Sequence, residues 1–173
     1  MTAFAQTPLL RMQATGAVLF VLLLAGCAPY GPPRVGVGAS VEESERSMGL
    51  PTGEYPLPAA GRRLEFARGP YGEHTWMMDF DATGRLLHSE QVLTIAHFNE
   101  IVPGMPAAEV LQRIGRPSEV GRIGFQDRAL WNYRYEGSFC LWFQLGIDAS
   151  EHVVDAGYGP DPRCDEGRRD NNP

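Results

Sequence analysis

Histidines and carboxylates are the side chains here that could bind a metal or carry out acid–base catalysis. Four histidines are spread over different predicted elements: His74, His88, His97 and His152. Two of them directly follow a glutamate, and adjacent residues of a strand point to opposite faces, so neither pair presents two ligands to one ion. Asp81 and Asp148 occupy matching turns in two similar segments, which indicates hairpin structure. We therefore expect no metal site, no bound cofactor and no catalytic residue, and we predict that the protein is not an enzyme.

Residues 1–26 have the pattern of a secretory signal peptide. They contain no acidic residue and one basic residue, Arg11, followed by an apolar run over residues 17–24. That run is too short to span a membrane. A basic start, a short apolar stretch and small residues before a cleavage point predict export and removal of this segment.

The small residues end on a cysteine, and Leu24-Ala25-Gly26-Cys27 resembles the lipobox of bacterial lipoproteins. The resemblance implies that Cys27 is acylated and becomes the first residue of the mature chain. Three acyl chains would hold the protein on a membrane effectively permanently. Because Ala28 and not an aspartate follows the cysteine, the resemblance also implies sorting to the outer membrane, on its periplasmic face. Residues 27–37 are rich in proline and glycine and are predicted to form a tether.

The cysteines that remain, Cys140 and Cys164, are predicted to form a disulfide because the periplasm is oxidising. The bond would fold residues 159–164, which include the start of the polar tail at 161–173, back over Trp142. Closing this loop would stabilise the fold by about 3 kcal/mol in the chain-entropy model. The alternative is a pair of free thiols.

The charge of the chain argues against a nucleic-acid partner. The formal net charge is −6, and the arginines are scattered. Nucleic-acid binding depends on clustered basic contacts. We therefore expect no nucleic-acid partner.

An internal repeat organises the rest of the chain. Gly38 and Gly49-Leu50-Pro51 recur as Gly104 and Gly115-Arg116-Pro117, displaced by 66 residues. Downstream the match continues at a displacement of 67, which one inserted residue explains. A fixed-period match of this kind predicts two copies of one supersecondary unit, residues 38–93 and residues 94–160.

Each unit is predicted to combine short helices with antiparallel strands, which makes the fold class α+β. Ser40 and Glu43 form a capping-box pattern that predicts a helix over 41–48, ended by Gly49. Hydrophobic spacing predicts two helices in the second unit, over 94–101 and 106–114. Strands are predicted over 63–67, 75–81, 85–91, 130–135, 139–147 and 152–158. The result is two tandem repeats, each with one or two helices on a three- to four-stranded antiparallel sheet.

Strand alternation predicts which side chains face the helices. Leu64, Phe66, Trp76, Met78 and Phe80 in the first unit correspond to Trp131, Tyr133, Phe143, Leu145 and Ile147 in the second. The opposite face carries Trp142, Arg134, Asn132 and Met77, and no helix of the same unit covers it. Since Trp and Arg are enriched where binding energy concentrates, these four residues are the candidate protein-binding surface. The alternative is that the tail or the other unit covers Trp142.

The stretch 98–117 contains FNEIVPGM, then EVL and IGRP. It resembles the SmpA/OmlA (BamE-like) family of outer-membrane lipoproteins, as do the aromatic strands and Tyr158 that follow. The resemblance covers 94–160 well and 38–92 more weakly, because the first unit lacks the Gly-Met pair and a preceding helix. The tandem arrangement is also similar to β-lactamase inhibitory protein, whose paired sheets form a concave binding surface. Both resemblances imply a protein-binding role.

Together these observations predict a lipid-anchored outer-membrane lipoprotein. It would bind a periplasmic or outer-membrane protein and support assembly or integrity of the envelope. The alternative is an inhibitor or ligand-binding protein of a periplasmic enzyme, as the similarity to β-lactamase inhibitory protein allows.

Overall fold

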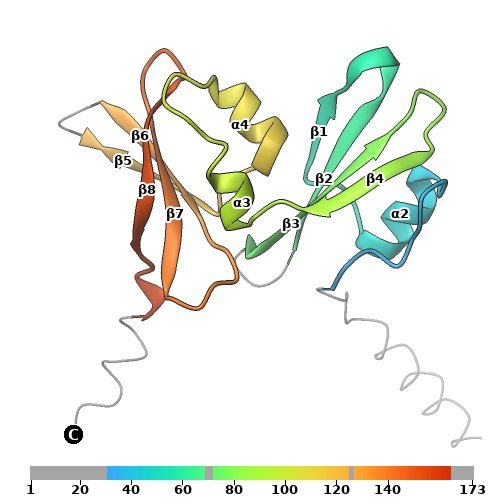
Figure 1. Cartoon of the computed structure of the whole chain (residues 1–173), viewed down its shortest axis with the longest axis horizontal. Helices are drawn as coiled ribbons and strands as arrows, with labels where there is room; N and C mark the ends of the chain where they lie inside the picture. Colours follow the sequence, from blue (N-terminus) through green and yellow to red (C-terminus); the bar gives the residue numbers. More distant parts are fainter. Residues whose placement is uncertain (1–30, 69–71, 125–126, 165–173) are drawn as a thin grey trace, which may run out of the picture.

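The computed structural model describes residues 31–68, 72–124 and 127–164. It contains two four-stranded antiparallel sheets, in the orders β1-β2-β3-β4 and β5-β6-β7-β8 (Figure 1). The elements of the first unit are α2 (Val41–Met48), β1 (Gly53–Pro56), η1 (Pro58–Ala60), β2 (Arg62–Arg68), β3 (His74–Phe80) and β4 (Leu86–Gln91). Those of the second are α3 (Ile95–Phe98), α4 (Ala107–Ile114), β5 (Glu119–Ile123), β6 (Arg128–Tyr133), β7 (Leu141–Ile147) and β8 (Val153–Pro160). The predicted α+β fold in two similar halves is confirmed.

The helix α2 has the predicted bounds because both of its ends are capped. The Ser40 hydroxyl accepts from the Glu43 backbone N–H at 3.2 Å, and the Glu43 carboxylate accepts from the Ser40 N–H at 2.8 Å. Gly49 ends the helix with φ 81°, a left-handed value that favours glycine.

The repeat extends to the backbone geometry of both units. Gly115 ends α4 with φ 78°, nearly the value at Gly49. Isolated bridges join Ser40 to Arg85 in one unit and Pro106 to His152 in the other. The ladder of each sheet also shifts register at the matching place, after Asp79 in β3 and after Gly146 in β7.

Two details of the elements differ from the sequence-based expectation. The helix predicted over 94–101 covers only Ile95–Phe98, because after it the backbone bonds from Glu100 and Ile101 close over three residues, a tighter turn than an α-helix. The strands β1 and β5 were not among the predicted strands. They are short edge strands, and each pairs with only one neighbour.

The elements stack in four layers: α2, the first sheet, α3 with α4, and the second sheet (Figure 1). The core between α2 and the first sheet consists of Val41, Met48, Leu64, Phe66, Met78, Phe80 and Leu86. The larger core contains Val110, Ile114, Tyr133, Phe143, Leu145 and Ile147, and it also takes in Met77 from the first sheet. Because α3 and α4 lie between the sheets, the sheets do not form one paired concave surface.

The predicted inward-facing residues mostly lie in these two cores. Trp76 and Trp131 are the exceptions, since both are only partly buried at the margins of the cores. Within the described ranges, none of the helices has the length and hydrophobicity needed to cross a membrane.

Candidate functional site

The four residues predicted to form an open binding surface are all buried. Their exposed fractions are 0% for Met77, 2% for Asn132, 5% for Trp142 and 8% for Arg134. We call the side of each sheet that faces away from its own helices the back face. All four residues do lie on back faces, as predicted, but each of them is buried, which corrects the expectation that they form an open surface.

The start of the C-terminal tail takes part in covering Trp142. The Arg134 guanidinium lies 4.8 Å from the centre of the indole ring, and Arg134 Nε is 3.0 Å from an Asp161 carboxylate oxygen. Arg163 binds Asp161 at 2.8 Å and also reaches Glu73 of the first unit at 3.0 Å. Although burial opposes ionisation of Asp161, hydrogen bonds from Arg163 and Arg134 keep its pKa below the ordinary value.

The predicted disulfide between Cys140 and Cys164 is present, with the two Cα atoms 6.2 Å apart. It attaches the tail to the start of β7, beside Trp142. Cys27, the predicted lipidation site, lies outside the described residues.

Glycines let polar side chains lie flat on the rest of the second back face. A Cβ atom at Gly159 would collide with the side chain of Gln144, and one at Gly146 would collide with Asp155. The Gln144 amide also donates to Asn132 at 2.8 Å. Around Asn132 and Trp142 this face is therefore closed by short-range contacts within its own sheet and by the tail.

The back face of the first sheet is covered in a different way, by α4 of the second unit. Met77 packs with Val110 and Ile114 in the larger core. Arg63 forms two hydrogen bonds to the Asp79 carboxylate, at 2.6 and 2.8 Å, and these raise the pKa of Arg63. Arg63 also donates to the backbone carbonyl of Gln112 near the C-terminus of α4, where a positive charge is favoured.

A buried carboxylate, Glu65, holds the two units together at the end of α4. It accepts from the Tyr55 hydroxyl at 2.6 Å, from the Thr52 hydroxyl at 3.0 Å and from the Arg116 backbone N–H at 3.3 Å. Close by, the Tyr133 hydroxyl donates to the Gly115 carbonyl at 3.0 Å. Burial raises the pKa of both Tyr55 and Tyr133, and the neighbouring Glu65 adds to each shift.

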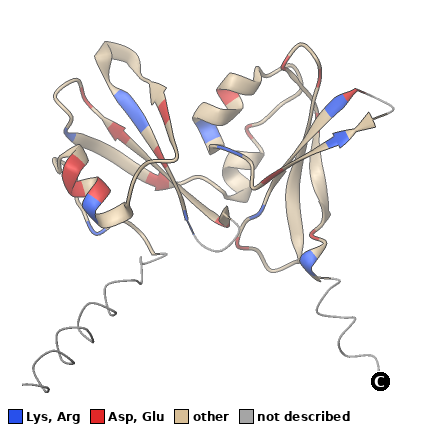
Figure 2. Cartoon of the chain, turned by 180° about the vertical axis from the view of Figure 1, so that it is seen from behind, with Lys and Arg blue, Asp and Glu red and all other residues tan. Residues whose placement is uncertain are grey.

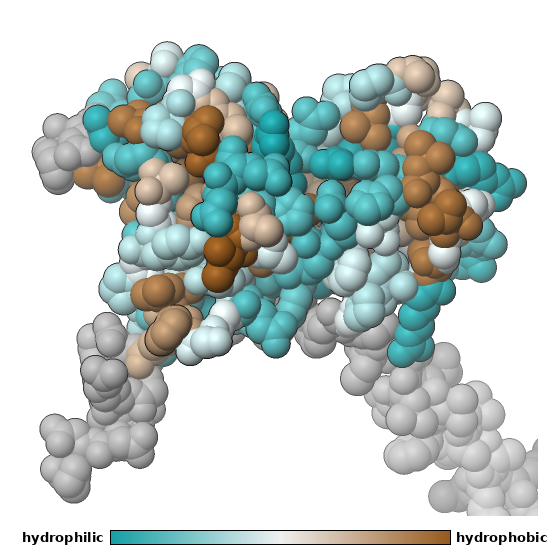
Figure 3. All heavy atoms as spheres, viewed as in Figure 1, coloured by the Kyte–Doolittle hydropathy of each residue, from teal (hydrophilic) through white to brown (hydrophobic). Residues whose placement is uncertain are grey.

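Above this contact lies an open groove of about 700 Å³ between β1 and α4, which we call the inter-unit groove. Its walls include Tyr55, Leu57, Arg63, Ala108, Gln112 and Arg113. Figure 3 shows it as the notch between the two halves, on the side away from residues 31 and 164, where the described chain begins and ends. Gln112 bridges the groove by donating to the Pro56 carbonyl at 3.0 Å, so the two walls are fixed relative to each other.

The side chains of the inter-unit groove suit protein recognition. Tyrosine and arginine dominate the energetic centres of protein interfaces, and a preformed groove needs little ordering on binding. Arg113 is itself oriented by Glu109 and Glu100, at 2.8 and 2.9 Å. Across residues 31–68, 72–124 and 127–164, no three His, Cys, Asp or Glu side chains gather in a way that could hold a metal ion.

Sequence reasoning missed this groove because one wall is β1, which carried no clear strand pattern. The sequence of α4, which forms the other wall, does contain an indication of the groove. The repeat places Ala108 of α4 opposite Glu42 of α2, and Gln112 opposite Arg46. Smaller or uncharged residues on the outer side of one helix copy indicate that it packs against something the other copy does not.

Comparisons with known proteins place the chain in no family. No family model matches it, and no curated protein matches it. Among solved structures, a cysteine-rich secretory protein from Staphylococcus aureus aligns with 76% of this chain at 11% identity and a TM-score of 0.28. The chain spans about half the length of that protein, 48%. A similarity this low carries no argument about fold or function.

Proposed function

We propose that this protein is a lipid-anchored lipoprotein of the outer membrane, on its periplasmic face, that binds another protein through the inter-unit groove. The partner is a periplasmic or outer-membrane protein, and the complex supports assembly or integrity of the envelope. The observation that carries the proposal is the groove itself, a preformed recess with a tyrosine and two arginines in its walls.

The location rests on two features of the chain. The N-terminal segment ends in Leu24-Ala25-Gly26-Cys27, the lipobox-like sequence. The Cys140–Cys164 disulfide is consistent with a periplasmic location, because disulfides persist in oxidising compartments such as the periplasm.

The protein-binding role rests on the rigidity of the groove. Its two walls belong to different units, but Gln112, Arg63 and Glu65 bond them together. A partner segment would therefore meet a preformed surface, and Tyr55, which is already bonded to Glu65, loses little freedom on contact.

The test is a detergent pull-down of the acylated protein beside an Ala108→Glu variant, with bound proteins identified by mass spectrometry. Ala108 is exposed in the first turn of α4, where a glutamate is compatible with the helix and would place a charge in the groove. The matched control is Glu42→Ala, the reciprocal exchange at the equivalent position of α2. Equal thermal midpoints for the three proteins would establish that folding is unchanged.

The proposal predicts enrichment of outer-membrane barrels or their assembly machinery by the wild type and the Glu42→Ala control, and at least a tenfold loss in Ala108→Glu. Capture of the same proteins by Ala108→Glu would show that the groove is not the binding site. Capture of one soluble periplasmic enzyme in a one-to-one complex would instead support an inhibitor.

A further inference from the structure

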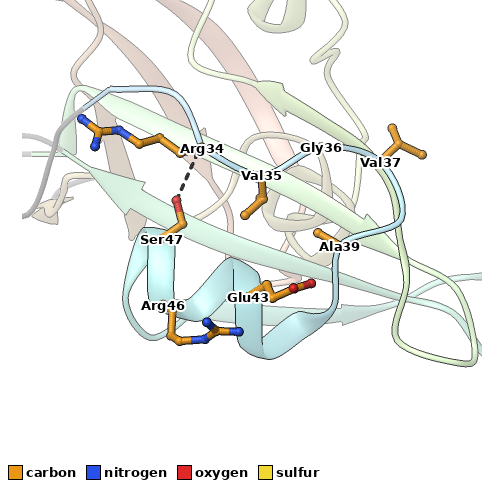
Figure 4. A pocket seen from close by; sticks show the side chains of 8 residues that line it. All are labelled: Arg34, Val35, Gly36, Val37, Ala39, Glu43, Arg46 and Ser47. Atoms are coloured by element: carbon orange, nitrogen blue, oxygen red, sulfur yellow. Dashed lines mark hydrogen bonds between the residues drawn. The ribbon is translucent and has the colours of Figure 1, made fainter.

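The N-terminal segment is attached to the first unit from Arg34 onward. The Arg34 backbone N–H donates to the Ser47 hydroxyl at 3.1 Å, and Val35 packs against the first core (Figure 4). Gly38 and Ala39 then pair with Leu86 of β4, both bonds being 2.8 Å long. Four residues predicted to belong to the tether, 34–37, therefore lie along α2.

This attachment shortens the free tether. Seven residue steps separate Cys27 from Arg34, and a fully extended chain of that length spans at most about 25 Å. A compact chain of this size has a radius of gyration of about 14 Å, so a path around to its opposite side measures on the order of 50 Å. A bilayer that holds Cys27 must therefore face the side of the molecule from which the tether leaves.

That side also carries the connection between β6 and β7. In two opposite views the described chain begins and ends on the same side, and the β6–β7 connection lies there too (Figures 1 and 2). The connection contains Phe139, whose side chain is 77% exposed. It is one of the most exposed large apolar side chains among the described residues.

The loop that carries Phe139 is held firmly at its base. The Leu141 backbone N–H donates to the Phe139 carbonyl at 2.8 Å, and the next residue, Cys140, is joined to Cys164. The Asp161 backbone N–H donates to the Cys140 carbonyl at 3.1 Å. The aromatic ring is thus presented outward on a fixed support.

We propose that the Phe139 loop contacts the lipid surface and, together with the acylated Cys27, fixes the orientation of the protein on the membrane. The proposal rests on the proposed function, because it requires the anchor. Lipid is the expected occupant because the short tether brings this side against the bilayer, and apolar side chains such as phenylalanine bury themselves at the boundary between headgroups and acyl chains. The inter-unit groove then faces away from the membrane, toward soluble partners or the periplasmic parts of membrane proteins.

Tryptophan quenching by brominated lipid tests this contact. The acylated full-length product is reconstituted in phosphatidylcholine vesicles as wild type, Phe139→Trp and Leu87→Trp. Leu87 is 55% exposed and lies in β4, near the turn that points away from the tether, so it is the matched control. After subtraction of the wild-type signal, brominated phosphatidylcholine should reduce the added Phe139→Trp fluorescence at least twofold and leave that of Leu87→Trp nearly unchanged.

Equal quenching at the two positions, or quenching only at position 87, would overturn the proposal and leave Phe139 to a protein partner or to the tail. Whether Cys27 is acylated is measured separately, from the mass of the purified protein. If Cys27 carries no acyl groups, its thiol, the one outside the disulfide, is coupled to a maleimide lipid and the same comparison is repeated. The Phe139 contact is therefore decided whether or not cells acylate the chain.

Discussion

The two sheets bury their back faces by different means. The first sheet uses another unit: α4 packs on Met77, and Arg63 and Glu65 bond to its C-terminal end. The second sheet uses its own polar side chains, which lie flat over glycines, and a tail held by a disulfide. Both strategies leave less than a tenth of Met77 or Trp142 exposed. A residue on a back face can therefore be buried even when no helix of its own unit covers it, and its position alone does not make it a binding residue.

The largest expected effect separates the two faces of β3. Met77 and Met78 are neighbours with 0% exposure, but Met77 packs against the second unit and Met78 against α2. Each substitution by alanine should lower the free energy of unfolding by about 2–5 kcal/mol. Only Met77→Ala should split urea unfolding into two transitions, because only it weakens the contact between units. A single transition with an unchanged slope in both variants would mean that the polar contacts alone couple the units.

Removal of the disulfide should affect the second back face alone. The double variant Cys140→Ser with Cys164→Ser should lose about 3 kcal/mol of stability in the chain-entropy model. Tryptophan emission should shift to the red as the tail leaves Trp142, while amide exchange in β3 and α4 stays slow. An unshifted emission spectrum would show that side chains of the sheet cover Trp142 without the tail.

The two helix caps provide a smaller and better matched contrast. Gly49 and Gly115 have nearly the same positive φ, so alanine at either position costs about 1–2 kcal/mol. A Cβ atom at Gly115 would also lie 3.0 Å from both Glu65 Cδ and Thr75 Cγ2, whereas at Gly49 its nearest contact is an Arg68 nitrogen at 3.8 Å. Gly115→Ala should therefore be more destabilising than Gly49→Ala by about 1 kcal/mol, as measured by chemical denaturation. Equal losses would indicate that the contact between units adjusts freely.

The smallest effect at neutral pH involves the tyrosines between the units. Because the pKa values of Tyr55 and Tyr133 are raised, their contribution to stability is complete below pH 10, where tyrosines of the unfolded chain begin to ionise. That contribution is lost as pH rises toward the folded-state values. Absorbance at 295 nm should show delayed ionisation in the folded protein, and Tyr55→Phe should reduce the loss of stability between pH 9 and 11. A titration in which all six tyrosines ionise together near pH 10 would contradict this assignment.

The repeat, the capped helix α2 and the disulfide could be predicted because they rest on local signals: glycine spacing, the Ser40–Glu43 pair and two cysteines in a chain with the pattern of an export signal. The strand β1 could not, since Tyr55 is its one strong β-former and Pro56 ends it. The inter-unit groove depends on how α4 packs on the first unit. The sequence indicates this contact only indirectly, because α4 has Ala108 at the position where α2 has Glu42. The burial of Trp142 could not be predicted either. The alternation of side chains along a strand determines which face of the sheet a residue lies on, but not what covers that face.

The four-layer stack also has two different end surfaces, the outer side of α2 and the back face of the last sheet. The contact between α4 and the preceding sheet is head-to-tail, because it joins a helix of one unit to the sheet of the other. If α2 of one molecule packed in the same way on the last sheet of a second molecule, the contact could repeat and form a filament. Neither end matches the surfaces that meet at α4. The outer side of α2 carries Glu42 and Arg46 where α4 has Ala108 and Gln112, and Figure 2 shows acidic residues along α2. At the other end Asp161 of the tail binds Arg134, which lies over Trp142 on the back face of the last sheet. In repeat proteins, terminal units with a polar outer surface of this kind close the array.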